Sequence, residues 1–334
     1  MTVSALLAAC IGGGCAKSHR TEVVVYAALD RGFSEPILDK FEKATGIKVL
    51  VKYDTESTKT VGLVNTIRAE KERPRCDVFW NNEIVNTLRL KHEGLLAPCK
   101  PAAAEPYPPV FRDAEGYWFG FAARARVLLV NTNLVPEDQM PDSIFSLADP
   151  KWKGRIGIGK PLFGTTATHA ACLFAAMGTD KAQAFYHSLK ANNMRITAGN
   201  KAVALDVSAG RLAFAITDTD DALEEVEAGK PVVIVYPDGK PDQMGDLFIP
   251  NTLSMIKGAP HPEAAEKLIE YLLSPGVETA LAEGAACQIP LNPQVKVKLR
   301  VKTPAEIKPM EVDFGQAAER FDEASRYLAE SFLE

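Results

Sequence analysis

The chain has 334 residues, 46% of them hydrophobic and 24% charged, which is an ordinary globular composition and long enough for two lobes. The formal net charge is -5, and the Lys and Arg residues are scattered rather than clustered. This distribution argues against a nucleic-acid-binding surface and against a polybasic membrane patch. We therefore expect a two-lobed α/β protein with no nucleic-acid partner.

The N-terminal segment differs in kind from the rest of the chain. Its first residues, "MTVSALLAACIGGGC", are small and apolar, and they are too few to span a bilayer as a helix. The "LAAC" sequence resembles the cleavage box of a bacterial lipoprotein signal, with Cys10 as the lipidated residue. We expect residues 1–21 to be a signal segment and spacer. The protein is then periplasmic or at the cell surface, held to the membrane only by a lipid anchor; a disordered tail with incidental cysteines is the alternative.

The cysteines of the body show neither a CxxC motif nor metal-ligand spacing; they are Cys76, Cys99, Cys172 and Cys287. Buried apolar thiols are the favoured interpretation. A disulfide between Cys76 and Cys99 in an oxidising compartment is the alternative.

Strands and helices alternate through the first part of the body. The pattern predicts strands over 22–29, 47–53 and 76–80, and helices over 33–46, 58–71 and 83–92. Gly46 is expected to close the first helix. A βαβ opening of this kind predicts a parallel sheet.

A long extended segment over 118–132 has no turn signal in its middle, so it is expected to carry the chain between two lobes. Beyond it the pattern predicts strands over 212–216, 231–236 and 252–257, and helices over 165–177, 180–191, 201–209, 261–273 and 274–284. In the last of these helices, Ser274 is the expected N-cap and Gly284 the expected end. A further helix is expected near 314–333.

An acidic cluster follows the strand predicted over 212–216. The stretch "RLAFAITDTDDALEE" places Asp218, Asp220 and Asp221 on a turn between that strand and a helical pattern. Such turns are where α/β proteins place binding groups. In the alternative interpretation, Asp218 caps the helix and the other two carboxylates favour its positive end.

Several motifs follow one another in the order seen in a known family. They are "VVVYAALD", "CDVFWNNE", "RVLLVNT", "SLADPKWKGRIGIG" and the late "HPEAAEKLIEYLLSPGVETAL" with "IPLNP". Over about 22–333 the chain resembles the ferric-iron-binding proteins of bacterial ABC importers. The resemblance implies a type II periplasmic-binding-protein fold, in which two α/β lobes joined by hinge strands close on a solute. It also implies delivery of that solute to the transmembrane subunits of an ABC permease.

The same resemblance implies the lobe boundaries and the oligomeric state. One lobe would hold 22–123 plus about 250–298, and the other 124–249 plus about 299–334. We expect a monomer.

The family's metal ligands can be carried over position by position. A histidine past the first-strand tyrosine corresponds to Asp30, and the ligand after the "DVF" strand corresponds to Glu83 or Asn82. The family's tyrosine pair corresponds to Asp220 and Asp221, so this chain has carboxylates in place of phenolates. Such oxygen donors suit hard cations: Ca²⁺, Mg²⁺, Mn²⁺ or ferric iron. The predicted metal ligands are Asp30, Glu83, Asp220 and Asp221.

The start of the helix predicted over 165–177 is a candidate anion site, because free backbone N–H groups, hydroxyls and the helix dipole meet there. The resemblance implies phosphate or carbonate bound together with the metal. Two arginines on one side of the long extended segment are expected to complete the site. The predicted anion-binding residues are Gly164, Thr165, Thr166, Arg124, Arg126 and Asn200. Helix capping by the threonines and a solvated strand face for the arginines are the alternatives.

A cleft with an acidic end and a basic end also fits an organic ligand. An aminoalkylphosphonate, an organic phosphate or a polyamine is the alternative ligand class. Tyr26, Trp80 and Phe163 would then form walls, and Asn82 and Asp218 would lie beside the ligand. Ordinary core packing is the alternative for the three aromatic residues.

An enzyme is the remaining alternative. The "AFAITDTDDAL" stretch imitates the motif of haloacid-dehalogenase-type phosphatases, with Asp218 as nucleophile, Asp220 as general acid/base and Mg²⁺ beside them. In those enzymes the motif opens the fold, whereas here most of the chain precedes it. We therefore expect capture of a solute without catalysis and without a catalytic cofactor.

Overall fold

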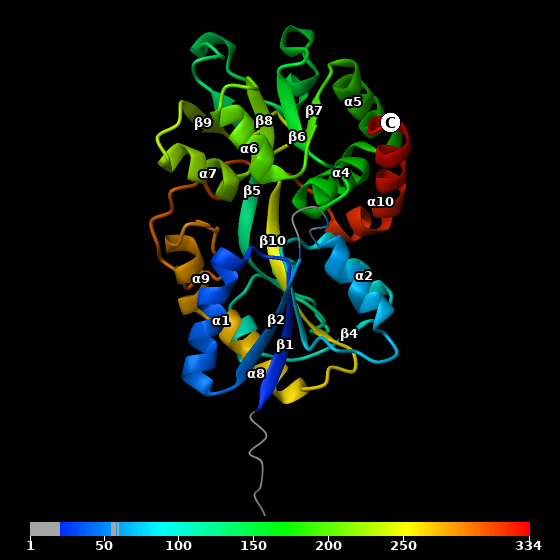
Figure 1. Cartoon of the computed structure of the whole chain (residues 1–334), viewed down its shortest axis with the longest axis vertical. Helices are drawn as coiled ribbons and strands as arrows, with labels where there is room; N and C mark the ends of the chain where they lie inside the picture. The colour runs from blue at the N-terminus through cyan, green and yellow to red at the C-terminus, as the bar shows by residue number, and fades with distance from the viewer. Residues whose placement is uncertain (1–20, 55–57, 59) are drawn as a thin grey trace, which may run out of the picture.

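The computed structural model describes residues 21–54, 58 and 60–334. The predicted lipidation site, Cys10, and nearly all of the signal segment lie outside these ranges. The chain forms two α/β halves stacked along the long axis of the molecule (Figure 1). The lobe boundaries given above stay a prediction.

The lower half in Figure 1 contains the βαβ opening. β1 (Glu22–Ala27) pairs in parallel with β2 (Lys48–Tyr53) on one side and with β3 (Val78–Asn81) on the other. The helices of this half are α1 (Arg31–Thr45), α2 (Val61–Ala69), α3 (Val85–His92), α8 (Pro262–Leu272) and α9 (Pro275–Glu283). These elements confirm the predicted alternation.

The upper half has a second parallel arrangement. β6 (Ile156–Gly159) pairs in parallel with β7 (Arg195–Thr197) and with β8 (Phe214–Asp218). Its helices are α4 (Gly164–Met177), α5 (Thr179–Ala191), α6 (Asn200–Ser208), α7 (Thr219–Glu227) and α10 (Phe314–Tyr327). The last of these packs along α4 and also contacts α3.

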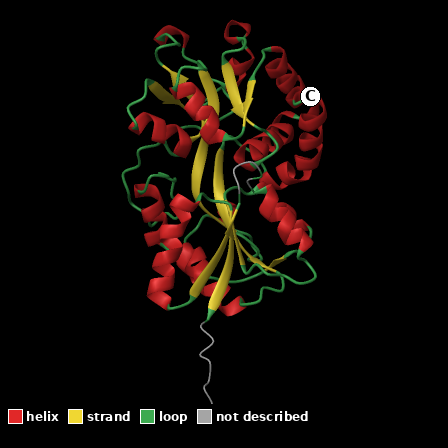
Figure 2. Ribbon diagram, in the orientation of Figure 1, coloured by secondary structure: helices red, strands yellow, loops and turns green. Residues whose placement is uncertain are grey.

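Two long strands join the halves (Figure 2). β5 (Phe119–Asn131) is the extended segment predicted over 118–132, and it is buried along its whole length. Its first part pairs with β10 (Phe248–Ile256), and from Arg126 onward it pairs with β8 and with β9 (Val232–Val235). The partner of β5 therefore changes between Ala125 and Arg126, which is where the two halves meet.

Three strands are absent from the predicted pattern: β6, β7 and β4 (Leu96–Ala97). They are short, and β6 alternates isoleucine with glycine, so it lacks the branched apolar run typical of a buried strand. A Cβ on Gly157 would lie 2.5 Å from Leu212 Cδ1 and 2.8 Å from Val203 Cγ2. Packing of α6 and of the segment before β8 against β6 therefore requires glycine there.

The helix ends agree with the sequence in part. Gly46 closes α1 at φ 71°, and its N–H donates to the carbonyl of Glu42 at 2.9 Å. Ser274 occupies the N-cap position of α9, but its hydroxyl makes no capping hydrogen bond.

The four described cysteines are buried and free, so the predicted buried thiols are confirmed and Cys76 is not bonded to Cys99. Burial raises the pKa of the Cys76 thiol. Among the described helices, none has the length and apolar character needed to cross a bilayer.

A buried carboxylate braces β5 at the junction of the two halves. Ala122 has φ 46°, an uncommon backbone conformation for a residue other than glycine. Its N–H donates to Glu278 Oε1 at 2.6 Å, and Glu278 also accepts the N–H groups of Leu291 and Asn292 at 3.0 and 2.7 Å. One side chain of α9 thus satisfies three buried backbone donors.

We expect Glu278→Ala to lower the free energy of unfolding by about 2–4 kcal/mol, because three buried N–H groups lose their acceptor. Urea unfolding monitored by circular dichroism measures this loss. Glu283→Ala, at an exposed position of the same helix, is the control and should change stability by less than about 0.5 kcal/mol. Equal stability of the two variants would contradict the bracing role.

Candidate ligand-binding site

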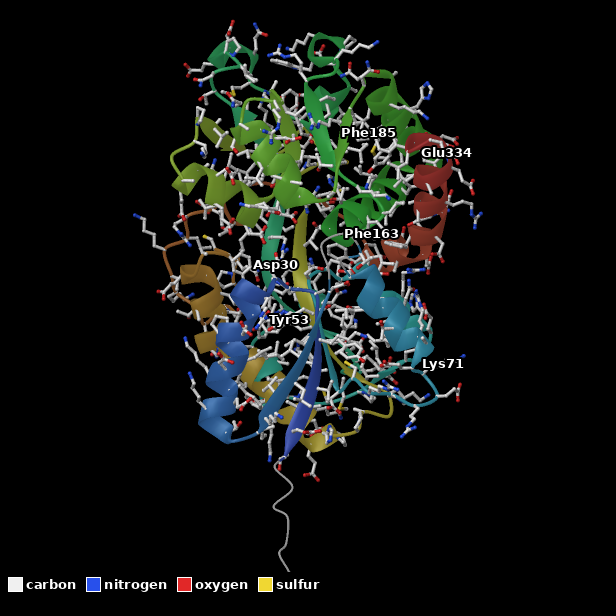
Figure 3. The ribbon with its side chains drawn as sticks, in the orientation of Figure 1. Asp30, Tyr53, Lys71, Phe163, Phe185 and Glu334 are labelled. Atoms are coloured by element: carbon white, nitrogen blue, oxygen red, sulfur yellow. The ribbon has the colours of Figure 1, made fainter. Side chains whose placement is uncertain are left out.

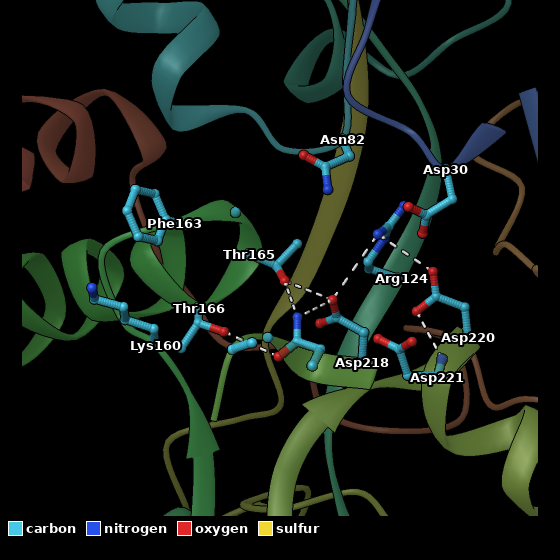
Figure 4. Close-up of a pocket in the computed structure, with 14 residues that line it drawn as sticks. Asp30, Asn82, Arg124, Lys160, Phe163, Thr165, Thr166, Asp218, Asp220 and Asp221 are labelled. Atoms are coloured by element: carbon cyan, nitrogen blue, oxygen red, sulfur yellow. Dashed lines mark hydrogen bonds and ion pairs between the residues drawn. The ribbon is translucent and has the colours of Figure 1, made fainter. Parts of the chain in front are cut away.

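A pocket lies where the two halves meet (Figure 4). From the lower half come Asp30, just before α1, and Asn82, just after β3. Figure 3 shows Asp30 and Phe163 at the facing ends of the two halves. The other lining residues come from β5 and from the upper half: Arg124, Lys160, Phe163, Gly164, Thr165, Thr166, Ala198, Gly199, Asn200, Asp218, Asp220 and Asp221.

The acidic turn forms one wall of this pocket. β8 ends at Asp218 and α7 begins at Thr219, as the sequence predicted for a strand-to-helix turn. One carboxylate oxygen from each of Asp218, Asp220 and Asp221 lies within 4.8 Å of the other two. Asp30 faces this group across the pocket (Figure 4).

The structure argues against capping as the role of Asp218. This residue is the N-cap of α7, yet its side chain makes no capping hydrogen bond. Its Oδ1 accepts from Arg126 Nη1 at 2.6 Å, and its Oδ2 accepts from Thr165 Oγ1 at 2.6 Å and Asn200 Nδ2 at 2.8 Å. Burial acts to raise the pKa of Asp218, but Arg126 and Arg124 outweigh burial and lower that pKa. Asp218 is therefore an ionised carboxylate held in place by Arg126, Thr165 and Asn200.

The start of α4 forms a second wall. Gly164 has φ 54°, a conformation that favours glycine, and Phe163 is the N-cap. The threonine hydroxyls do not cap the helix: Thr165 donates to Asp218, and Thr166 donates to Asn200 Oδ1 at 3.0 Å. The hydroxyls thus join α4 to β8 and α6, and capping does not explain them.

The two arginines of β5 have different surroundings. Arg126 is fully buried behind the pocket, where it donates to Asp218, Thr165 and Asn200, and it is absent from the pocket lining. Arg124 lines the pocket, with Nη1 3.4 Å from Asp220 Oδ2 and 4.0 Å from Asp218 Oδ2. Burial alone would lower the pKa of the Arg124 guanidinium, but the pocket carboxylates outweigh burial and raise it.

The structure differs from the sequence prediction at Glu83. This residue does not line the pocket, and its side chain is fully buried. Its oxygens accept from Asn81 Nδ2 at 2.7 Å, Thr168 Oγ1 at 2.6 Å and the N–H of Asn86 at 3.1 Å. The carboxylate turns back onto the first turn of α3 and binds α4, so it is not directed at the pocket. Burial raises its pKa.

Two of the predicted aromatic walls also lie elsewhere. The hydroxyl of Tyr26 donates to Glu70 Oε2 at 2.8 Å on the far side of β1 from Trp80. The ring of Trp80 packs against Phe121, with ring centroids 5.5 Å apart. Both residues are core, as the alternative interpretation stated, whereas Phe163 lines the pocket.

Sequence reasoning missed three lining residues: Lys160, Ala198 and Gly199. Lys160 directly follows β6, and its Nζ lies 5.5 Å from the centroid of the Phe163 ring. The carboxyl ends of parallel strands are where such sheets bind ligands, so recognising β6 as a strand would have pointed to Lys160. A Cβ on Gly159 would lie 3.0 Å from the Gly199 backbone, so glycine lets the two segments meet.

His169 lies on α4 near this site without contacting the pocket. It is buried, and burial together with Arg126 lowers its pKa to about 3. The imidazole is therefore neutral at physiological pH, in agreement with a core residue.

The pocket is small as well as polar. The space that water could occupy is ≈ 20 Å³, about the room that one water molecule or one ion requires.

Residues 37–309 match the family described as bacterial extracellular solute-binding protein. The chain belongs to this family. A relative named iron uptake protein A1, from Synechocystis sp., is 27% identical over 290 residues, which cover 83% of this chain and 79% of the relative. A Salmonella typhi periplasmic protein named for binding 2-aminoethylphosphonate is 27% identical over 76% of this chain and 73% of its own length.

The fold of this solute-binding protein agrees with that of solved members. The iron-bound HitA structure from Pseudomonas aeruginosa superposes with a TM-score of 0.82 at 23% identity, covering 92% of this chain and 98% of HitA. The two-lobed periplasmic-binding-protein fold expected from the resemblance is therefore confirmed.

We expect Asp218→Asn to lower the free energy of unfolding by about 3–5 kcal/mol, because it leaves the buried Arg126 guanidinium without its counter-charge. The Asp220→Asn, Asp221→Asn double variant should lose less stability than Asp218→Asn, because Arg126 keeps its counter-charge and Arg124 keeps Asp218 at 4.0 Å. Urea unfolding of the chelator-treated proteins at neutral pH compares the two. If Asp218→Asn were as stable as wild type, the ion pair of Asp218 with Arg126 would not hold the site together.

Proposed function

We propose that this solute-binding protein captures a hard multivalent cation in the pocket between its lobes and presents it to an ABC permease. The observation that carries the proposal is the convergence of carboxylate oxygens from Asp218, Asp220 and Asp221 within 4.8 Å. Asp30, from the other half of the molecule, completes the acidic set. Glu83 is no longer among the proposed ligands, because its carboxylate binds α3 and α4.

The chemistry of the donors favours a hard cation. Anionic oxygen ligands suit ferric iron, Mn²⁺, Ca²⁺ or Mg²⁺ better than soft metals. Carboxylates held this close repel one another, so a multivalent cation would stabilise the closed pocket. The small volume of the pocket also fits one ion better than an organic molecule. The relative named iron uptake protein A1 makes ferric iron the first candidate.

An accompanying anion is part of the proposal. Arg124, Lys160 and the start of α4 at Gly164 supply positive charge and N–H donors beside the carboxylates. Phosphate or carbonate bound there would balance the charge of a trivalent cation. Arg126 supports this site through Thr165 and Asn200 without lining it.

An aminoalkylphosphonate is the second candidate. Acidic and basic groups share one pocket, and the relative named for 2-aminoethylphosphonate binding has the same 27% identity to this chain as the iron-uptake relative, over a shorter alignment. The phosphonate would bind at Arg124 and Thr165, and its ammonium group at Asp220 and Asp221. This ligand requires the lobes to open further, since the pocket has room for about one water molecule.

Capture fits the site better than phosphoryl transfer does. The nucleophile of the phosphatase alternative would be Asp218, but both of its oxygens are already bound by Arg126, Thr165 and Asn200. A carboxylate with a lowered pKa in such a network is a weak nucleophile. No catalytic role is assigned to any residue of the pocket.

Delivery of the ion would follow the pathway of the family. We propose export to the periplasm or the cell surface, a lipid anchor at Cys10, and action as a monomer with the transmembrane subunits of a permease. The evidence for the anchor is the "LAAC" sequence alone.

We expect ferric citrate, Mn²⁺ or Ca²⁺ to raise the thermal midpoint of the chelator-treated protein by several degrees at large excess over the dissociation constant. Phosphate should increase the shift produced by the cation. Differential scanning fluorimetry measures both effects. A shift with 2-aminoethylphosphonate and with none of the cations would favour the second candidate.

The Asp220→Asn, Asp221→Asn double variant should abolish the cation-dependent shift, because two of the proposed ligands lose their charge. Glu319→Gln, at an exposed position on α10, is the control and should retain it. A double variant that binds Mn²⁺ with wild-type affinity would contradict the assignment of these two ligands.

A further inference from the structure

The guanidinium of Arg124 lies at the centre of the acidic wall. Its side chain is 3% exposed, and its Nη1 is 3.4 Å from Asp220 and 4.0 Å from Asp218. These contacts are ion pairs, and Arg124 Nε has no hydrogen-bond partner although it is buried. Figure 4 shows the guanidinium between Asp30 and the acidic turn. Arg126 Nε also lacks a partner, so the feature that distinguishes Arg124 is its place in the pocket lining, with Nη1 directed at two carboxylates.

The rear edge of this guanidinium is anchored at the junction of the halves. Arg124 Nη2 donates to Asn251 Oδ1 of β10 at 3.3 Å. With its amide oxygen turned toward the guanidinium, Gln288 accepts from the same Nη2 at 2.7 Å. Asn251 Nδ2 in turn donates to the carbonyl of Ala122. Nη2 is therefore held by the scaffold, whereas Nη1 faces the pocket carboxylates.

The charges of the site show what this arrangement does. Asp218 is neutralised by Arg126 behind the pocket. Asp30, Asp220 and Asp221 carry the remaining negative charge of the lining; Arg124 supplies one positive charge among them, and Lys160 supplies a second one beside Phe163. A monovalent cation that entered the site would only replace the single positive charge of Arg124. Because Arg124 is part of the chain, its effective concentration at the site is high, and it outcompetes such an ion. A multivalent cation brings more charge than it displaces.

We propose that Arg124 is a built-in competitor for the cation site, which excludes monovalent cations and gives way to a multivalent one. This inference rests on the proposed function, since it assigns the selectivity of that cation site to one residue. When the cation binds, Arg124 keeps its Nη2 contacts and turns Nη1 toward an oxygen of the accompanying anion. Arg124 thereby couples release of the carboxylates to binding of the anion.

The test is the affinity of the full chain for Mn²⁺, measured by isothermal titration calorimetry after chelator treatment, with and without phosphate. Arg124→Gln removes the competitor, so Mn²⁺ should bind at least ten-fold more tightly in phosphate-free buffer, and phosphate should no longer increase the affinity. Millimolar guanidinium chloride should compete with Mn²⁺ in this variant, because the free ion occupies the vacated position. The same addition should leave wild type unaffected.

Two further variants make the result specific. Arg195→Gln removes the same charge from a half-exposed position on β7 that is absent from the pocket lining, and it should bind Mn²⁺ as wild type does. Arg124→Lys keeps the positive charge but replaces the planar guanidinium with a single ammonium group. Its affinity for Mn²⁺ in phosphate-free buffer should therefore lie between those of wild type and Arg124→Gln. If Arg124→Gln does not fold, the increase predicted for Arg124→Lys remains testable.

Weaker Mn²⁺ binding by both Arg124 variants in phosphate-free buffer would overturn the inference, because Arg124 would then be a support of the site and not a competitor. Absence of binding by the wild-type chain to Mn²⁺, ferric citrate and Ca²⁺ would be a failure of the proposed function itself. The two failures are therefore distinguishable.

Discussion

The buried ion pair between Arg126 and Asp218 is the interaction on which the candidate site depends. It joins β5 to the end of β8, and the same two side chains bind Thr165 of α4 and Asn200 at the start of α6. Two charges buried without water are costly unless each is paired and hydrogen-bonded, and this network meets that condition for Asp218. Because Asp218 is held in this way, the turn that follows it has a fixed direction. Asp220 and Asp221 are carried on that turn into the pocket.

The fold places this ion pair at a meeting point of several elements. β5 exchanges β10 for β8 as its partner next to Arg126, and the helices α4, α6 and α7 all begin beside the same pocket. The N-termini of α4 and α6 contribute N–H groups and positive dipole ends, so that wall favours anions, whereas the start of α7 carries Asp220 and Asp221. Acidic and basic groups thus face one small space. Such a space is better matched to an ion with its counter-ion than to an apolar solute.

Much of this arrangement could be read from the sequence. The apolar run followed by "TDTDD" predicted carboxylates on a strand-to-helix turn, and the "FGTT" stretch predicted a helix start beside them. Other features depend on tertiary contacts that local pattern does not encode. Arg124 and Arg126 share one side of an extended strand by period two, but the change of strand partner between them sends one into the pocket and the other behind it.

Glu83 and Lys160 show that local sequence does not fix which side chains enter the pocket: Glu83 was predicted to do so and does not, whereas Lys160 was not predicted and does. Glu83 has the right residue type and nearly the right position for a metal ligand, but its carboxylate is bound by Thr168, a residue 85 positions along the chain. Lys160 lines the pocket, but its strand contains two glycines that pack against neighbouring elements, and that composition conceals the strand. In both cases the outcome depends on which side chains the fold brings together, and one sequence alone does not give that information.

The most direct test of this account is a crystal structure of the chelator-treated protein soaked with Mn²⁺ and phosphate, with anomalous diffraction data to locate the metal. The account predicts one anomalous peak in the pocket, within about 2.0–2.3 Å of oxygens from Asp220 and Asp221, and the Arg124 guanidinium displaced toward a bound anion. A pocket without an anomalous peak at saturating Mn²⁺, or a peak whose ligands exclude both aspartates, would contradict it.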